Sequence, residues 1–236
     1  MRTAGALACV AVLAAGCGPA AQEPLFPLEE GRRWQYALAI AYDDGAADMV
    51  SERLEWRARG AADFGGAPAF KRTSDSGMAY WLRSDATGVY RIAAQGPLDP
   101  APRPDAAARY VLKKPFAVGT EWQADTTAYV LRRRNEFPPE LRHLARYRSL
   151  PIKYRIAQLD AQVETPAGRF ERCLRVDGTG EIHLHVDELL AVRPVPFTTR
   201  EWYCPQVGLV KLERIERSPT RFLAGGTLTM ELVDYR

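Results

Sequence analysis

The chain has few of the residue types and motifs that commonly carry chemistry. Its 236 residues include three histidines and four cysteines and no Cys-x-x-Cys pair, which excludes a thioredoxin-like redox motif. A Gly-x-Ser-x-Gly nucleophile elbow and a P-loop are also absent, and Gly178-Thr179-Gly180 lacks the third glycine of a dinucleotide site. We therefore expect neither a catalytic activity nor a resident cofactor.

Neither sign of charge is in large excess. The 32 basic and 29 acidic side chains leave a net charge of +3, too close to neutral to indicate a nucleic-acid partner. The chain has one long apolar run, Ala4 to Ala15, so no helix is expected to span a membrane elsewhere. The 220 residues after position 16 are enough to bury a core without a metal or a disulfide.

The N-terminal segment predicts export. Arg2, the apolar run and the small residues before Cys17 have the layout of a signal peptide spanning residues 1–16. The segment from Leu13 to Cys17 resembles the lipobox of bacterial lipoproteins, which implies a lipid on Cys17. The composition of residues 18–24 predicts a flexible tether, so residues 17–24 are expected to form the lipidated cysteine and its tether. By the same resemblance, Gly18 after the anchor favours the periplasmic face of the outer membrane. An ordinary cleaved signal and a soluble secreted protein are the alternative.

Two cysteines remain for the folded part, Cys173 and Cys204, because Cys9 lies in the signal segment and Cys17 is expected to carry lipid. In an oxidising periplasm they most simply form one disulfide. Two separate buried thiols are the alternative.

Short β-like runs separated by turn residues predict an all-β domain over residues 25–236. We expect a curved antiparallel meander, either open or partly closed like a barrel. Its predicted strands include 33–42, 152–164, 170–176, 181–192, 199–204, 209–216 and 227–235. Residues 96–105, with four prolines, are expected to form a linker, and residues 139–150 one short helical insertion.

A box of nine residues occurs twice, at 27–35 and at 115–123. Both copies read Pro, apolar, two variable residues, Gly, two variable residues, Trp, Gln. We interpret the box as a turn that feeds a strand, with glycine at an unusual backbone angle and tryptophan as the first large core residue. The alternative is that Trp34 and Trp122 line a ligand site. The repeat indicates two similar halves, about 25–95 and 110–236.

The two boxes, the turn from Thr165 to Phe170 and the segment from Trp202 to Lys211 together resemble a group of uncharacterised bacterial lipoproteins. The resemblance covers residues 25–236. It implies a β-rich envelope protein with no assigned activity.

The strand-like segment around two histidines is a candidate metal site. In a strand, Glu181, His183, His185 and Asp187 would share one face, and histidine with carboxylates can bind zinc or another divalent ion. The alternative is the solvated face of an amphipathic strand.

A basic segment is a candidate for contact with an anionic surface, such as lipid headgroups. The residues concerned are Arg132, Arg133, Arg134, Arg142, Arg146 and Arg148. A solvated loop is the alternative, because charge runs usually face water.

Two classes of function follow. The favoured one is a membrane-anchored envelope lipoprotein that acts as a structural or interaction module for an envelope protein partner. The alternative is a periplasmic carrier that holds a lipid or other apolar small molecule in the concave face of the sheet. A packed interior would favour docking, and an unfilled interior lined by Trp, Phe and Leu would favour the carrier.

Overall fold

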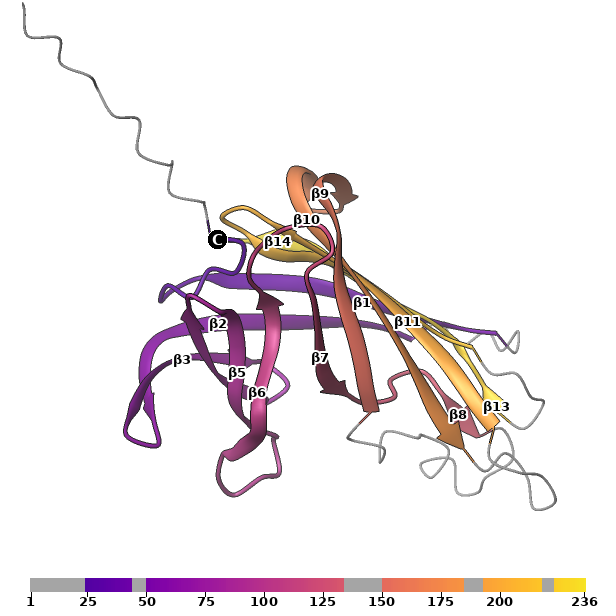
Figure 1. Cartoon of the computed structure of the whole chain (residues 1–236), viewed down its shortest axis with the longest axis horizontal. Coiled ribbons are helices and arrows are strands. Elements are labelled where there is room, and N and C mark those ends of the chain that lie inside the picture. The colour runs from indigo at the N-terminus through magenta and orange to yellow at the C-terminus, as the bar shows by residue number, and fades with distance from the viewer. Residues whose placement is uncertain (1–23, 44–49, 134–149, 185–192, 218–222) are drawn as a thin grey trace, which may run out of the picture.

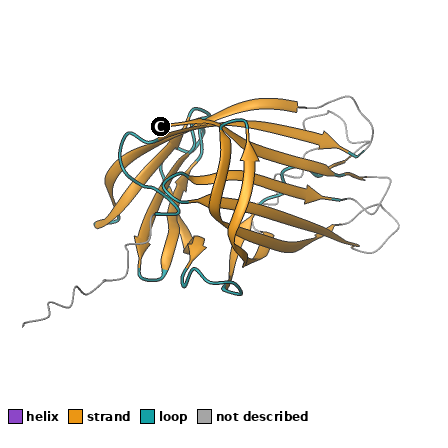
Figure 2. Cartoon of the chain, turned by 90° about the horizontal axis from the view of Figure 1, so that it is seen from above, coloured by secondary structure: helices purple, strands orange, loops and turns teal. Residues whose placement is uncertain are grey.

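The computed structural model describes residues 24–43, 50–133, 150–184, 193–217 and 223–236. These residues form strands and loops, and no helix occurs among them (Figure 2). The strands are β1 (Arg33–Tyr42), β2 (Val50–Phe64), β3 (Ala67–Ser74), β4 (Ala79–Asp85), β5 (Gly88–Gln95), β6 (Arg103–Lys113), β7 (Glu121–Thr126), β8 (Arg132–Arg133), β9 (Leu150–Thr165), β10 (Gly168–Leu184), β11 (Arg193–Cys204), β12 (Gly208–Glu216), β13 (Leu223–Ala224) and β14 (Gly226–Tyr235).

One antiparallel sheet contains 12 of these strands, and it curls into a nearly closed barrel shape (Figure 1). From β1 the chain runs in order through β6 to one edge of the sheet, while β14, β12, β11, β10, β9 and β7 lead to the other edge. The first and last strands, β1 and β14, pair in the middle. The edge strands β6 and β7 are not paired with each other, which leaves a seam. The all-β meander predicted from the sequence is confirmed.

The small pair β8 and β13 forms a separate two-stranded ribbon. Within the residues described, no helix has the length and hydrophobicity needed to cross a membrane. The predicted helical insertion at 139–150 lies outside the described residues, except for Leu150, which begins β9 and is buried.

Strand β1 coincides with the strand predicted at 33–42. The prediction of two strands at 170–176 and 181–192 was wrong, because β10 runs unbroken through the intervening glycines. These glycines serve packing instead. A Cβ at Gly178 would lie 2.5 Å from Cγ2 of Thr199, and one at Gly180 would lie 2.3 Å from Cζ of Phe197.

The linker predicted at 96–105 ends earlier than expected, since β6 begins at Arg103 and includes Pro104. Proline lacks the N–H that a central strand must donate, but an edge strand needs hydrogen bonds on one side only. The position of β6 at the edge of the sheet therefore explains the difference.

The glycines of the two boxes adopt the backbone conformation that the sequence predicted. The φ angle is 86° at Gly31 and 94° at Gly119, and β1 and β7 each begin two residues later. Only glycine adopts such angles without strain.

The two box tryptophans are core residues, with 2% of Trp34 and 5% of Trp122 exposed. The indole Nε1 of Trp34 donates a hydrogen bond to the carbonyl of Val207, 2.6 Å away. Trp122 stacks on Tyr154 with 5.4 Å between ring centroids. The boxes therefore anchor their strands in the core.

Cys173 and Cys204 form a disulfide with an S–S distance of 2.01 Å, as predicted. It joins β10 to β11 inside a buried cluster that also contains Trp34 and Val210. A larger cluster fills the wall formed by β7 and β9–β11 and includes Ile152.

Candidate functional site: the interior cavity

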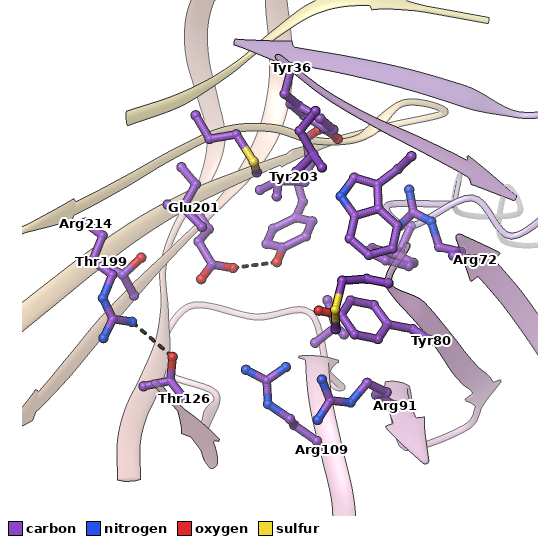
Figure 3. A pocket seen from close by; sticks show the side chains of 18 of the residues that line it. Tyr36, Arg72, Tyr80, Arg91, Arg109, Thr126, Thr199, Glu201, Tyr203 and Arg214 are labelled. Carbon is purple, nitrogen blue, oxygen red and sulfur yellow. Dashed lines mark hydrogen bonds between the residues drawn. The ribbon is translucent and has the colours of Figure 1, made fainter. Parts of the chain in front are cut away.

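A cavity of about 400 Å³ lies inside the curve of the sheet (Figure 3). Eleven of the twelve strands of the sheet line it, and β10 is the one strand of the described sheet that contributes no side chain. Alternate residues along a strand face the same side, as Thr199, Glu201 and Tyr203 of β11 do here. The volume lies within the ~300–1,000 Å³ typical of small-molecule sites.

One wall of the cavity is largely apolar. Four adjacent strands, β2, β1, β14 and β12, form it. They contribute Leu54, Leu38, Leu228, Met230 and Leu212. Met230 lies opposite Leu38 on one side and opposite Leu212 on the other, so these side chains form a continuous row. Such a row favours contact with an alkyl chain or an apolar ring.

Charged side chains reach the same cavity. The lining contains four arginines and one carboxylate, namely Arg72, Arg91, Arg109, Arg214 and Glu201 (Figure 3). A charge removed from water is costly unless hydrogen bonds and an opposite charge compensate it. The partners of each arginine therefore decide whether it serves the fold or is available to a ligand.

Arg214 of β12 is fully engaged by the protein. Its Nε donates to Oε1 of Glu216 at 2.6 Å, while Nη1 donates to Thr126 Oγ1 at 3.0 Å and Nη2 to the carbonyl of Thr127 at 2.8 Å. Glu216 is 0% exposed and also accepts hydrogen bonds from the backbone amides of residues 129–131. This pair fixes the segment after β7 against β12 and is part of the fold.

Glu201 of β11 is the carboxyl group of the cavity. The hydroxyl of Tyr203 donates a hydrogen bond to its Oε2 at 2.5 Å (Figure 3). Burial raises the pKa of Glu201, although the Tyr203 hydrogen bond and the nearby guanidinium groups of Arg109 and Arg214 act in the opposite direction. Burial likewise raises the pKa of Tyr203 well above its ordinary value.

Arg72 of β3 differs from Arg214 in the partners of its guanidinium group, which are aromatic rings. Its guanidinium lies 4.0 Å from the ring centroid of Trp34 and 4.6 Å from that of Phe26. Its Nε is buried with no hydrogen-bond acceptor, and no carboxylate among the described residues pairs with it. Burial lowers the pKa of Arg72 to about 10, so the side chain remains a cation at neutral pH. The rings partly compensate the charge, but an anion would do so more completely.

Arg91 and Arg109 lie directly opposite each other on β5 and β6. Arg91 makes two hydrogen bonds to Asp105, at 2.8 and 2.6 Å. Arg109 donates from Nε to the carbonyl of Asp125 on β7, at 2.6 Å, which bridges the seam. Within the described part of the chain Arg109 has no carboxylate partner, and like charges placed opposite each other are destabilising.

The predicted metal site is described only in part. Glu181 and His183 are exposed on the outer face of β10, and Ile182 between them is 1% exposed and faces inward. His185 and Asp187 lie outside the described residues. No group of three or more potential metal ligands occurs among the residues described, and the metal site stays a prediction.

The basic segment and the lipid anchor also lie largely outside the described residues. Arg132 lies over the ring of Tyr42 at 3.7 Å, and the backbone of Arg133 pairs with Leu223 in the ribbon of β8 and β13. Arg134, Arg142, Arg146 and Arg148 are not described, and neither is Cys17.

Sequence reasoning missed the charged lining of the cavity. Arg214 shares a strand face with Leu212, and Arg72 lies opposite Tyr80. In the sequence an arginine in phase with apolar residues is the signal, but the same pattern arises at the margin of any solvated face. Only the curl of the sheet shows whether such an arginine faces an interior cavity or lies at the margin of a solvated face.

Comparison with known proteins adds little to these observations. No family model matches the chain, and no curated protein matches it. Two solved structures are similar: a presumed lipoprotein from Parabacteroides distasonis, with 12% identity and a TM-score of 0.39, and a presumed exported protein with a YmcC-like fold from Bacteroides fragilis, with 14% identity and a TM-score of 0.40. The alignments cover 91% and 92% of this chain and 99% and 100% of those chains. No conclusion about this protein is drawn from likeness at this level.

Proposed function

We propose that this protein is an envelope lipoprotein whose sheet binds an apolar or amphiphilic small molecule in its interior cavity. The cavity of about 400 Å³ carries the proposal, because a purely structural sheet has no need of an unfilled interior. The lining includes Trp56, Phe26 and a row of leucines, as the carrier alternative requires.

The predicted lipid anchor at Cys17 supports the envelope location in this proposal. The signal-like segment and Cys17 support attachment to a membrane, with the sheet in the periplasm. A lipid on Cys17 would keep the cavity close to a bilayer. The periplasmic face of the outer membrane is the location that Gly18 favours.

The test uses the chain from Gly18 onward, which holds every described strand, expressed with an ordinary secretion signal and purified from a periplasm. Native mass spectrometry is expected to show an added mass that disappears on denaturation. The emptied protein is then titrated with the neutral fluorescent probe N-phenylnaphthylamine. We expect saturable binding at one site.

A cavity-filling variant localises the binding. Leu212→Trp adds bulk to the apolar wall and is expected to weaken the probe by about tenfold, or roughly 1.4 kcal/mol. Its neighbour Glu213 does not line the cavity, so Glu213→Trp is the matched control. A protein that carries no ligand and does not bind the probe would contradict the proposal, and the search would move to a protein partner.

A further inference from the structure

The row of apolar side chains and the three arginines without a full set of carboxylate partners come from different strands of the cavity. Leu54, Leu38, Leu228, Met230 and Leu212 come from β2, β1, β14 and β12, whereas Arg72, Arg91 and Arg109 come from β3, β5 and β6, which form a cationic wall. Figure 3 shows the guanidinium groups of Arg91 and Arg109 extending into the same hollow, with Arg72 on the wall beside Tyr80. A ligand that satisfies both walls needs an apolar part and a polar head.

The cationic wall has more positive charge than the protein neutralises. Asp105 pairs with Arg91, while no carboxylate among the described residues pairs with Arg72 or Arg109. The one carboxyl in the lining, Glu201, accepts a hydrogen bond from Tyr203 and lies near both Arg109 and Arg214, so it offsets only part of this charge. Each guanidinium offers five N–H donors, so Arg72 and Arg109 together retain donors for several acceptor oxygens.

The arrangement of Arg72, Arg91 and Arg109 also destabilises the fold when no ligand is bound. Arg72 buries Nε with no acceptor, and Arg91 and Arg109 place like charges opposite each other. Both features cost free energy in the empty protein. An anionic group bound in the cavity would offset the excess of positive charge on this wall.

From this geometry we infer that the ligand is an anionic amphiphile, whose carboxylate or phosphate head is held by Arg72, Arg91 and Arg109 and whose alkyl chain lies along the leucine and methionine wall. The inference rests on the proposed function and specifies the class of ligand. Arg109 lies at the seam, where its Nε bridges to β7, so the head is held next to the unpaired edges of the sheet.

The test compares four molecules that share a chain or a head: dodecanoate, dodecyl phosphate, dodecanol and inorganic phosphate. Each is titrated calorimetrically into the emptied wild-type protein, below the concentration at which the amphiphiles aggregate. Dodecanoate and dodecyl phosphate are expected to bind at least about tenfold more tightly than dodecanol, since hydrogen bonds to charged groups are the stronger ones. Inorganic phosphate is expected to bind far more weakly than dodecyl phosphate.

Substitutions assign the effect to the named residues. Arg72→Met and Arg109→Met keep an unbranched side chain, shorter than that of arginine, and remove its charge, so each is expected to reduce the preference for dodecanoate over dodecanol. Arg72→Lys keeps the charge and should retain part of the preference. Arg200 lies on the same sheet, is exposed and does not line the cavity, so Arg200→Met is the matched control.

The outcomes separate this inference from the proposed function. Equal affinity for dodecanoate and dodecanol in the wild type would overturn the anionic head and leave an apolar binding site intact. Phosphate that binds as tightly as dodecyl phosphate would identify a site for a free anion and overturn the amphiphile. Failure of all four molecules, together with no binding of the neutral probe, would overturn both. The wild-type comparison needs no variant, so a variant that does not fold cannot obscure the result.

Discussion

Arg214 and Arg72 line the same cavity from β12 and β3, yet the partners that the protein supplies to their guanidinium groups differ. Arg214 is 3% exposed and donates to Glu216, Thr126 and Thr127, so its charge and its donors are satisfied within the fold. Arg72 lies between aromatic rings with a buried Nε that has no acceptor.

The same contrast extends to the strands around them. The run β7 and β9–β14 contains most of the largest buried cluster, the disulfide and the Arg214–Glu216 pair. The run β2–β6 contains a much smaller cluster around Trp81 and contributes the arginines with spare donors. One wall of the barrel therefore provides the stability of the fold, while the other presents groups that a ligand can complete.

The largest effect on the free energy of unfolding is expected from breaking the Arg214–Glu216 pair. Arg214→Met leaves Glu216 as a buried charge without its cation and is expected to lower the free energy of unfolding by about 3–5 kcal/mol. Urea denaturation of the emptied protein measures the change. Lys211 is the control, because its ion pairs to Glu213 and Glu231 are partly exposed and Lys211→Met should cost only about 0–1 kcal/mol. Equal losses in the two variants would contradict the structural role of Arg214.

A smaller loss is expected from opening the disulfide within the stable wall. The double substitution Cys173→Ser and Cys204→Ser removes a cross-link over 31 residues and is expected to cost about 2–4 kcal/mol. Reduction of the wild type with dithiothreitol should produce a similar shift in the urea midpoint. A midpoint that does not move under either treatment would mean that packing alone holds β10 and β11 together.

The smallest effect has the opposite sign. Arg72→Met removes a charge with no carboxylate partner and is expected to raise the free energy of unfolding of the empty protein by up to about 1 kcal/mol, after the loss of its contacts with Trp34 and Phe26. Arg200→Met, on the exposed face, should stay within about 0.5 kcal/mol of the wild type. A loss of more than 1 kcal/mol on replacing Arg72 would place it with Arg214 as a structural residue and remove the contrast.

Local sequence signals predicted most of the strands. The alternation of β9, whose residues Leu150 to Ile156 are buried at every second position, is readable without tertiary information. The prediction failed at Gly178 and Gly180, where glycine suggested a break but makes room for Thr199 and Phe197 of the next strand. Such a signal is ambiguous, because glycine both ends strands and allows close packing.

By itself the sequence determined the class of fold, the turn glycines of the two boxes, the burial of their tryptophans and the choice of Cys173 and Cys204 for a disulfide. Each of these depends on a local property: alternation, backbone freedom, or the number of cysteines left to pair. The tertiary structure decided how β1 meets β14, where the seam falls, that the interior is not filled, and which arginine is paired. These depend on contacts such as Arg214 with Thr126, 88 residues apart, and Trp34 with Val207, 173 residues apart. No local pattern encodes contacts over such separations, because they exist only once the sheet has curled and brought its two halves together.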